Sequence, residues 1–279
     1  MANTIATFKQ YVPMLDEVYK AAALTSVLDG AAELASQGKN AGELVIPMMQ
    51  MDGLANYNRN SGYVSGNVSL TYETKKCNFD RGRMFSIDNM DNAETAGIAY
   101  GRLAAEFIRT KVVPELDAFR FAAYASAEGV SSASGSLASG ANVVTALRDA
   151  VTKMDEDEVP VEERYLFITP TLGGMIDDLD TTKSRAILSR FAKVIHVPQT
   201  RFYTIIDQVE GGFMPNGKEI NFMVIHKPAV IQFQKHVAPK VVTPEQNQSA
   251  DAWKFGYRNV GIAEAYQNKA AGIFVHHKA

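Results

Sequence analysis

The sequence predicts an α+β fold in which an extended pair of strands is followed directly by a long helix. Between residues 67 and 88, Val68, Leu70 and Tyr72 alternate with polar residues, which is the period of a β-strand. From residue 92 to 127, apolar residues instead recur every three or four positions, the period of an amphipathic helix. Shorter helix and strand patterns then follow in irregular order, without a fixed repeat.

Composition and charge narrow the class of protein. The chain has 279 residues, of which 46% are hydrophobic, so it can bury a large core. A net charge of −3 and a pI near 6.0 give no global basic field of the kind typical of nucleic-acid binders. Cys77 is the single cysteine, so it cannot form an intrachain disulfide, and residues 1–10 contain no apolar signal segment. We therefore expect a soluble protein of a reducing cytoplasm, without a membrane span.

The first part of the chain is predicted to be an N-terminal arm followed by a ribbon. Apolar residues from Leu15 to Ala23 have helical spacing, and two extended runs follow at 43–48 and 67–88. The apolar parity changes after Lys75-Lys76, which indicates a bulge or twist. A two-stranded ribbon alone is marginally stable, and this one has a polar tip. Either the ribbon lies across another subunit, or its strands belong to an ordinary internal sheet.

A capping box, Asp91-Asn92-Ala93-Glu94, is predicted to begin the long helix. The apolar stripe continues in phase past Pro114, although proline removes one backbone donor and clashes with the carbonyl four residues earlier. We therefore expect one helix with a bend near Thr110. Its length, on the order of 50 Å, exceeds the diameter of a small domain. A rod of this length beside a ribbon indicates a protein that contacts its neighbours.

After the long helix, the serine-rich segment 129–140 is predicted to be a flexible connection. Asn142 is predicted to cap the next helix, and Thr169-Pro170 to begin another. Pro215-Asn216-Gly217 is a strong turn signal, which predicts a hairpin between the strands on either side. Strand patterns in this half of the chain lie at 164–169, 202–207, 220–226, 230–233, 253–257 and 273–275.

Motifs for catalysis are not found in the sequence. No glycine-rich phosphate loop and no nucleophile elbow are present. Asp177, Asp178 and Asp180 could hold a hard cation, but an exposed helix end more commonly explains such a cluster. His276 and His277 would point to opposite faces of a strand, and we expect both at the surface. We therefore predict no catalytic, cofactor-binding or metal-binding residues.

The order of these parts resembles the major capsid proteins of tailed bacteriophages, which have the Hong Kong 97-like fold. The resemblance covers nearly the whole chain. The stretches that carry it are Val12-Pro-Met-Leu-Asp-Glu-Val-Tyr19, Phe79-Asp-Arg-Gly-Arg-Met-Phe-Ser-Ile-Asp88, Ala105-Glu-Phe-Ile-Arg-Thr-Lys-Val-Val-Pro-Glu-Leu-Asp-Ala-Phe-Arg120 and Asn268-Lys-Ala-Ala-Gly-Ile-Phe-Val-His276. The parts it implies are an N-terminal arm (1–41), an extended β-hairpin loop (42–90), a spine helix and peripheral domain (91–159), an axial domain (160–235) and C-terminal strands returning to the peripheral domain (236–279).

The resemblance also implies a function. It implies a structural protein, not an enzyme, that assembles into pentamers and hexamers of an icosahedral head around double-stranded DNA. The implied partners are further copies of the chain, a separate scaffolding protein, a portal and a maturation protease or decoration proteins, with DNA contacted non-specifically. Assembly would occur in the host bacterial cytoplasm, and the protein would reside in the virion. The alternatives are an encapsulin-like compartment shell, which shares the fold, and a metal-dependent hydrolase that uses the Asp177 cluster.

Contacts between subunits are expected on the ribbon and at its base, with Pro114 as the helix bend. The candidate contact residues are Tyr57, Arg59, Tyr63, Lys75, Lys76, Arg81 and Arg83. Some members of the resembled family join subunits by an isopeptide bond from a loop lysine to an asparagine. The loop tip here carries Arg59 and no lysine, so this bond is not expected.

Overall fold

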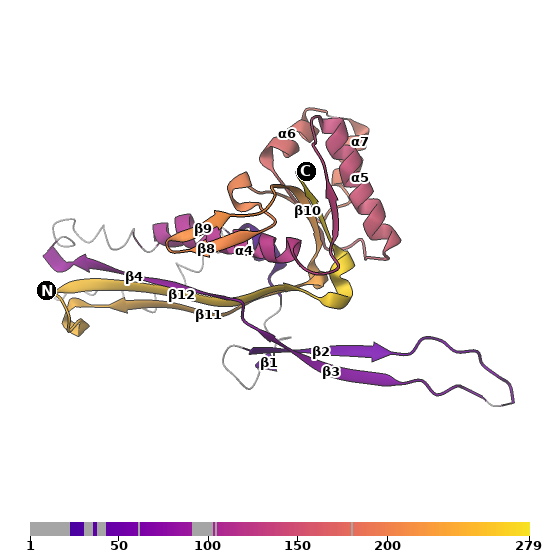
Figure 1. Ribbon diagram of the computed structural model, residues 1–279, viewed down its shortest axis with the longest axis horizontal. Coiled ribbons are helices and arrows are strands. Elements are labelled where there is room, and N and C mark those ends of the chain that lie inside the picture. Colours follow the sequence, from indigo (N-terminus) through magenta and orange to yellow (C-terminus); the bar gives the residue numbers. More distant parts are fainter. Residues whose placement is uncertain are drawn as a thin grey trace.

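The computed structural model describes residues 23–30, 36–37, 43–60, 62–90, 103, 105–179 and 181–279. They form a mixed α+β fold with a long three-stranded sheet, a five-stranded sheet covered by helices, and a hairpin that projects away from both (Figure 1). The N-terminal helix and the capping box expected from the sequence lie outside the described residues, as does most of the arm at 1–41.

The projecting hairpin consists of β2 (Glu43–Met51) and β3 (Val68–Lys76), with β1 (Ser36–Gln37) on the other edge of β2. The pairing of β2 with β3 is antiparallel and runs from Glu43 opposite Lys76 to Met51 opposite Val68. The prediction of one long second strand over 67–88 was wrong. The chain leaves the hairpin after β3 and enters a different sheet, which explains the change of apolar parity at this point.

The strand that leaves the hairpin, β4 (Phe79–Asp88), forms the edge of the long antiparallel sheet. Its neighbours, in the order β11-β12-β4, are β11 (Val230–Val242) and β12 (Ala252–Ala265). The long helix packs against this sheet through a buried apolar cluster. The cluster includes Phe79 from β4, Val112, Val113 and Leu116 from the helix, and Phe255 and Tyr257 from β12.

The described part of the long helix changes its winding next to Pro114. A π-helical segment, Ile108–Val112, precedes α4 (Val113–Ala125), and the Val113 N–H donates to the carbonyl of Ile108, five residues earlier. Proline lacks the N–H that a regular α-helix would need at this point, and its ring would press on the carbonyl four residues back. The irregularity therefore lies where the sequence predicted the bend.

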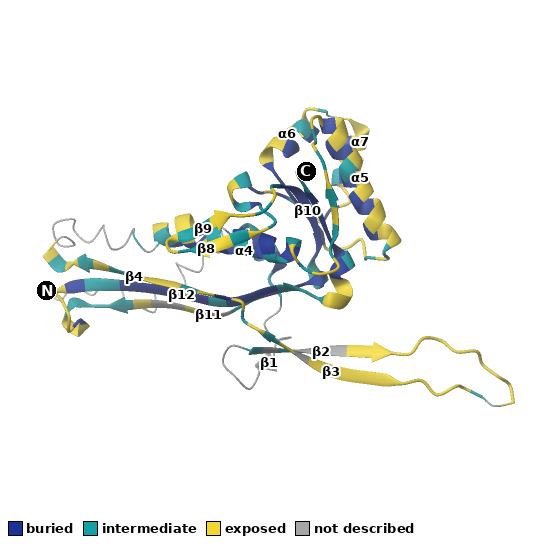
Figure 2. Ribbon diagram, viewed as in Figure 1, coloured by how far each residue is buried: buried dark blue, intermediate teal, exposed yellow. Residues whose placement is uncertain are grey.

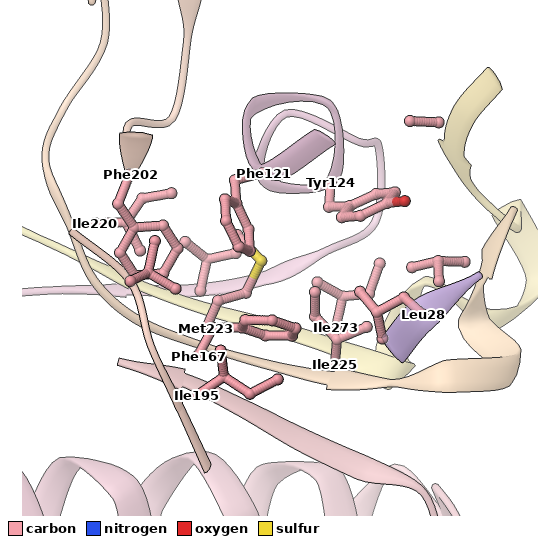
Figure 3. Close-up of a cluster of buried hydrophobic side chains, with 14 of the residues drawn as sticks. Leu28, Phe121, Tyr124, Phe167, Ile195, Phe202, Ile220, Met223, Ile225 and Ile273 are labelled. Atoms are coloured by element: carbon pink, nitrogen blue, oxygen red, sulfur yellow. The ribbon is translucent and has the colours of Figure 1, made fainter. Parts of the chain in front are cut away.

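The five-stranded sheet forms the second layer of the molecule. Its strands, in spatial order, are β5 (Ser131–Ser134), β13 (Ile273–His277), β10 (Ile220–His226), β6 (Arg164–Ile168) and β7 (Lys193–His196). One face is covered by α5 (Gly140–Glu156), α6 (Pro170–Asp177) and α7 (Thr182–Leu188). The other face packs on α4, where Phe121 and Tyr124 meet Phe167, Met223 and Ile273 (Figure 3). The central strand β10 is therefore buried along its whole length.

Three sequence predictions in this half of the chain were wrong. The serine-rich segment forms the edge strand β5, parallel to β13, in place of a flexible connection. Ser139, not Asn142, caps α5, because its hydroxyl accepts the Asn142 N–H at 3.3 Å. The hairpin turn lies at Glu210-Gly211, between β8 (Ile206–Val209) and β9 (Gly212–Pro215), where Gly211 has a φ of +91°.

Short helical turns lie at Leu24–Leu28, Gln199–Arg201, Lys227–Ala229, Pro244–Gln246 and Gln267–Gly272.

Two of the segments expected from the sequence, 91–159 and 236–279, contribute to more than one part of the fold. The segment 236–279 is divided between the two sheets. Its part of β11 (236–242) and all of β12 lie in the long sheet, whereas β13 lies inside the five-stranded sheet. Likewise α5, which was expected with the long helix, covers the five-stranded sheet.

Candidate assembly interface

Large apolar side chains are exposed mainly on the β2–β3 hairpin. Among the described residues, nine of the fifteen exposed large hydrophobic side chains lie between positions 49 and 72, and the hairpin is exposed along its outer length (Figure 2). They are Met49, Met51, Leu54, Tyr57, Tyr63, Val64, Val68, Leu70 and Tyr72. Exposed apolar residues are normally scattered, so this concentration indicates an interaction surface.

Five of these side chains form one face of the ribbon. Met49 lies opposite Leu70 and Met51 lies opposite Val68, and residues directly opposite each other in an antiparallel pair share a face. Gln50 and Ser69 lie on the other face, which is polar. The hairpin apolar face is defined as Met49, Met51, Val68, Leu70 and Tyr72. Burying a side chain of this size stabilises a contact by roughly 1.5–3 kcal/mol, so a covering surface would be strongly favoured.

The hairpin tip is folded beyond the paired strands. The Asn67 N–H donates to Asp52 Oδ2 at 2.8 Å, and the Asp52 N–H donates to the Asn67 carbonyl at 3.1 Å. Further out, the Gly62 N–H donates to the Asn58 carbonyl at 2.7 Å. The rings of Tyr57 and Tyr63 meet edge to face at 4.9 Å, although they are 60% and 90% exposed. The tip therefore presents a formed aromatic pair to its surroundings.

The base of the hairpin is fastened to the long sheet. The Asn78 side chain forms two hydrogen bonds with the backbone of Ala263: Nδ2 donates to the carbonyl at 2.8 Å, and Oδ1 accepts the N–H at 3.1 Å. Beside it, Lys75 Nζ lies 3.2 Å from Glu264 Oε2. These contacts set the direction in which the hairpin leaves the subunit.

The structure brings three predicted contact residues together. Tyr57, Arg59 and Tyr63 all lie exposed in the tip. Lys76 is exposed at the end of β3, where the hairpin meets the body. Lys75, in contrast, forms its ion pair with Glu264 of the same chain.

Arg81 and Arg83 lie outside the hairpin, contrary to the expectation that the ribbon includes them. The Arg81 Nε donates to Glu115 Oε1 at 2.7 Å, and its Nη2 donates to the carbonyls of Val209 and Gly212 at 2.6 and 3.1 Å. Burial raises the pKa of the Glu115 carboxyl, and the Arg81 guanidinium acts in the opposite direction. Arg81 therefore joins β4, α4 and the β8–β9 hairpin within one subunit.

A groove of about 890 Å³ lies beside Arg81, between β4, β12, the long helix and the β8–β9 turn. Its lining includes Phe85, Phe107 and Tyr257, with the rings of Phe85 and Phe107 edge to face at 4.8 Å. Asn259 also lines the groove; it is 1% exposed, and neither atom of its amide has a hydrogen-bond partner within the described structure. Sequence patterns did not predict this groove, because its walls come from segments far apart in the chain.

The candidate metal residues lie only partly within the described structure. Within the described ranges, no group of three or more His, Cys, Asp and Glu side chains is placed to hold a metal ion. Asp177 and Asp178 lie at the end of α6, and Asp180 is outside the described residues.

His276 is buried, which corrects its expected surface position, and its Nδ1 accepts a hydrogen bond from Asn221 Nδ2 at 2.9 Å. None of the helices that the structure describes is long and apolar enough to cross a membrane.

Comparison with known proteins gives matches among solved structures. No protein-family model and no curated protein sequence matches the chain. The capsid of the Myoviridae phage XM1 is 11% identical with a TM-score of 0.56, and the match covers 92% of each chain. The capsid structure of cyanophage P-SCSP1u is 13% identical with a TM-score of 0.58, over 88% of this chain and 84% of that one. A virus-like particle from Pyrococcus furiosus is 12% identical with a TM-score of 0.65, over 98% of this chain and 100% of that one. The fold class predicted from the sequence is therefore confirmed: the chain has the fold of phage capsid proteins.

Proposed function

We propose that this chain is a structural protein that assembles into a closed shell, as the major capsid protein of a tailed phage. The observation that carries the proposal is the hairpin apolar face, which projects from a capsid-like fold and remains exposed in the isolated subunit. A lone two-stranded hairpin is marginally stable, and a neighbouring copy would supply the surface that buries this face.

The proposed shell follows from contacts between two different surfaces. When a projecting surface meets a different surface on the next copy, the contacts generate rings if the rotation closes. We infer that the rings are pentamers and hexamers of an icosahedral head that encloses double-stranded DNA in a virion assembled in the bacterial cytoplasm. A scaffolding protein, a portal and maturation or decoration proteins belong to the same proposal. DNA would be contacted without sequence preference, in keeping with the net charge of −3.

Electron microscopy of the purified chain tests the proposal, with two adjacent substitutions on opposite faces of β3. Unmodified protein is expected to form closed particles tens of nanometres across. Leu70→Lys places a charge on the hairpin apolar face and is expected to abolish particles, because the charge would be buried at the contact. Ser69→Lys adds the same charge to the polar face and is expected to leave particles intact. Small oligomers from the unmodified chain, both alone and when expressed with the scaffolding protein of its native source, would contradict the proposal.

A compartment shell that encloses other cargo is the second candidate. The match to a virus-like particle from Pyrococcus furiosus motivates this candidate, because it spans nearly the full length of both chains and is not described as a phage capsid. The contents of particles purified from the native source distinguish the two candidates. Nuclease-protected DNA supports the phage head, and enclosed protein without DNA supports the compartment.

A further inference from the structure

A pocket of about 490 Å³ lies beside the start of α6, at one end of the five-stranded sheet. We propose that this pocket binds a small phosphate monoester, with the phosphate group at the N-terminus of α6. The inference goes beyond the proposed function and does not depend on it, because every residue that carries it belongs to one subunit.

The pocket forms where the carboxyl ends of four strands meet. β5, β13, β6 and β7 run in the same direction, and β10 runs against them. Residues that follow these four strands line the pocket, namely Gly135, Lys278, Thr169 and Pro198. Ligands of open sheets covered by helices commonly bind outside the carboxyl ends of the strands. The strand directions therefore place the pocket at the edge where such a fold usually binds its ligand.

The N-terminus of α6 presents unpaired hydrogen-bond donors to the pocket. Pro170 occupies the first helical position, and the N–H groups of Thr171 and Leu172 have no acceptor within the described structure. Both residues line the pocket. The first N–H groups of a helix carry partial positive charge, so this end of α6 favours an anion.

The hydroxyl of Thr169 is a further unpaired group in the same pocket. Thr169 is 6% exposed and lines the pocket, yet its side chain forms no hydrogen bond within the described structure. Buried hydroxyls are normally paired, so this one indicates a missing partner. A phosphate monoester carries three strong acceptor oxygens, which matches the hydroxyl and the two free N–H groups.

The charge of the lining also suits a phosphate. Lys278 has the only charged side chain among the described lining residues. Its ammonium pairs with Glu219, which does not line the pocket. Because an ammonium has three donors, Lys278 can contact a phosphate oxygen while it keeps this ion pair.

The size of the pocket indicates an ester in place of a bare phosphate. A volume of about 490 Å³ lies within the range of roughly 300–1,000 Å³ that is typical of small-molecule sites. Leu137 and Met175 give the pocket an apolar wall beside the polar end. Asn221 donates its Nδ2 to Gly135 and His276, which leaves its Oδ1 to accept from a hydroxyl of the ligand. The organic part of a monoester would occupy this region.

Isothermal titration calorimetry of the full chain tests the site, with inorganic phosphate and phenyl phosphate as probes at constant ionic strength. We expect one saturable site per chain and about tenfold tighter binding of phenyl phosphate, because its ring would be buried against the apolar wall. Equal affinities would overturn the assignment to a monoester. Absence of saturable binding by both probes would overturn the site and leave the shell function standing.

Substitution of Thr169 tests the polar end of the site. Thr169→Val removes the hydroxyl and keeps a similar shape, and it should weaken phenyl phosphate binding about tenfold because a hydrogen bond to a charged group is lost. Thr169→Ser keeps the hydroxyl and should preserve binding. Thr171→Val is the matched control, because the Thr171 side chain is exposed and its backbone N–H remains. Unchanged affinity of Thr169→Val would contradict the proposal.

Lys278→Gln decides the question if circular dichroism shows that Thr169→Val is not folded. This change should weaken binding about threefold, the effect expected of an exposed ionic contact, and unchanged affinity would contradict the proposed phosphate contact.

Ala279 also lines the pocket, and a terminal carboxylate directly after it would oppose an anion. Two glycines added after Ala279 move this carboxylate away, so the extended chain should bind phenyl phosphate at least as tightly as the original. Weaker binding by the extended chain would contradict an anion site.

Discussion

The carboxylate of Asp117, on α4, is fully buried and connects two other parts of the subunit to the helix. Its Oδ1 accepts hydrogen bonds from the Thr25 N–H and Oγ1 at 3.2 and 2.6 Å. Its Oδ2 accepts from the Leu24 N–H at 3.1 Å and lies 3.3 Å from Arg201 Nη1. Arg201 belongs to the turn that follows β7, so one side chain joins the start of the described chain, the long helix and the five-stranded sheet.

Replacing this carboxylate is expected to destabilise the fold. Asp117→Asn removes the charge that pairs with Arg201 and directs an NH₂ group toward other donors, which should lower the free energy of unfolding by about 3 kcal/mol. Urea unfolding measures the change. Glu128→Gln, at an exposed position, is the control and should change the free energy by less than about 0.5 kcal/mol. A loss below 1 kcal/mol for Asp117→Asn would show that the carboxylate is not an essential junction.

His276 should make stability depend on pH. Burial lowers its pKa from the ordinary value of 6.5, with a smaller contribution from His277, and Asn221 donates to its Nδ1. The unfolded chain therefore takes up a proton before the folded chain does, so this contribution is complete above about pH 6.5 and is lost as the pH falls below it. His276→Gln is expected to make the free energy of unfolding decline less steeply between pH 7 and pH 5. An unchanged slope in urea unfolding across that range would contradict this reasoning.

Local pattern predicted the strands and helices better than it predicted their partners. The helical spacing around Leu116 arises from burial of one face, and the alternation at Val68–Tyr72 places its apolar residues on one exposed face of the hairpin. Both periods are visible in a short window of sequence. The pairing of β4 with β12 depends on residues far along the chain, so the division of the ribbon was missed. Ser131–Ser134 has no apolar period and becomes a strand because its backbone bonds to β13.

The same distinction holds for the assembly surface. Turn-forming and polar residues between the two extended runs indicated the hairpin tip, and the structure places Tyr57 and Tyr63 there. The groove required the positions of four segments, and the polarity of Asn259 gives no indication that its amide is unpaired.

The π-helical segment before Pro114 is a testable point of adjustment. Pro114→Ala restores a backbone donor, which should allow Ile108–Val112 to return to regular α-helical winding. If this irregularity lets one chain fit both five-membered and six-membered rings, the variant should form particles of altered size or only one ring type. Electron microscopy of the variant particles measures both. Unchanged ring types and shell size would show that the adjustment lies elsewhere.

The subunit as a whole should fold without its hairpin tip. No residue between 43 and 76 belongs to the buried clusters of the described structure. Replacing 52–66 with a two-residue Asn-Gly turn should therefore leave a folded monomer that forms no shell. Circular dichroism and light scattering test the two halves of this prediction. A globally unfolded product would show that the hairpin belongs to the subunit's own core.

The fastening of Asn78 to Ala263 has a consequence for the timing of biosynthesis. The two residues are 185 positions apart, so the clamp closes only after most of the polypeptide has been translated, and contacts at such separation form slowly. Under the proposed shell function, the ribbon would gain its fixed direction only at that stage. A nascent chain that lacks Ala263 would then present no positioned ribbon to a sister molecule.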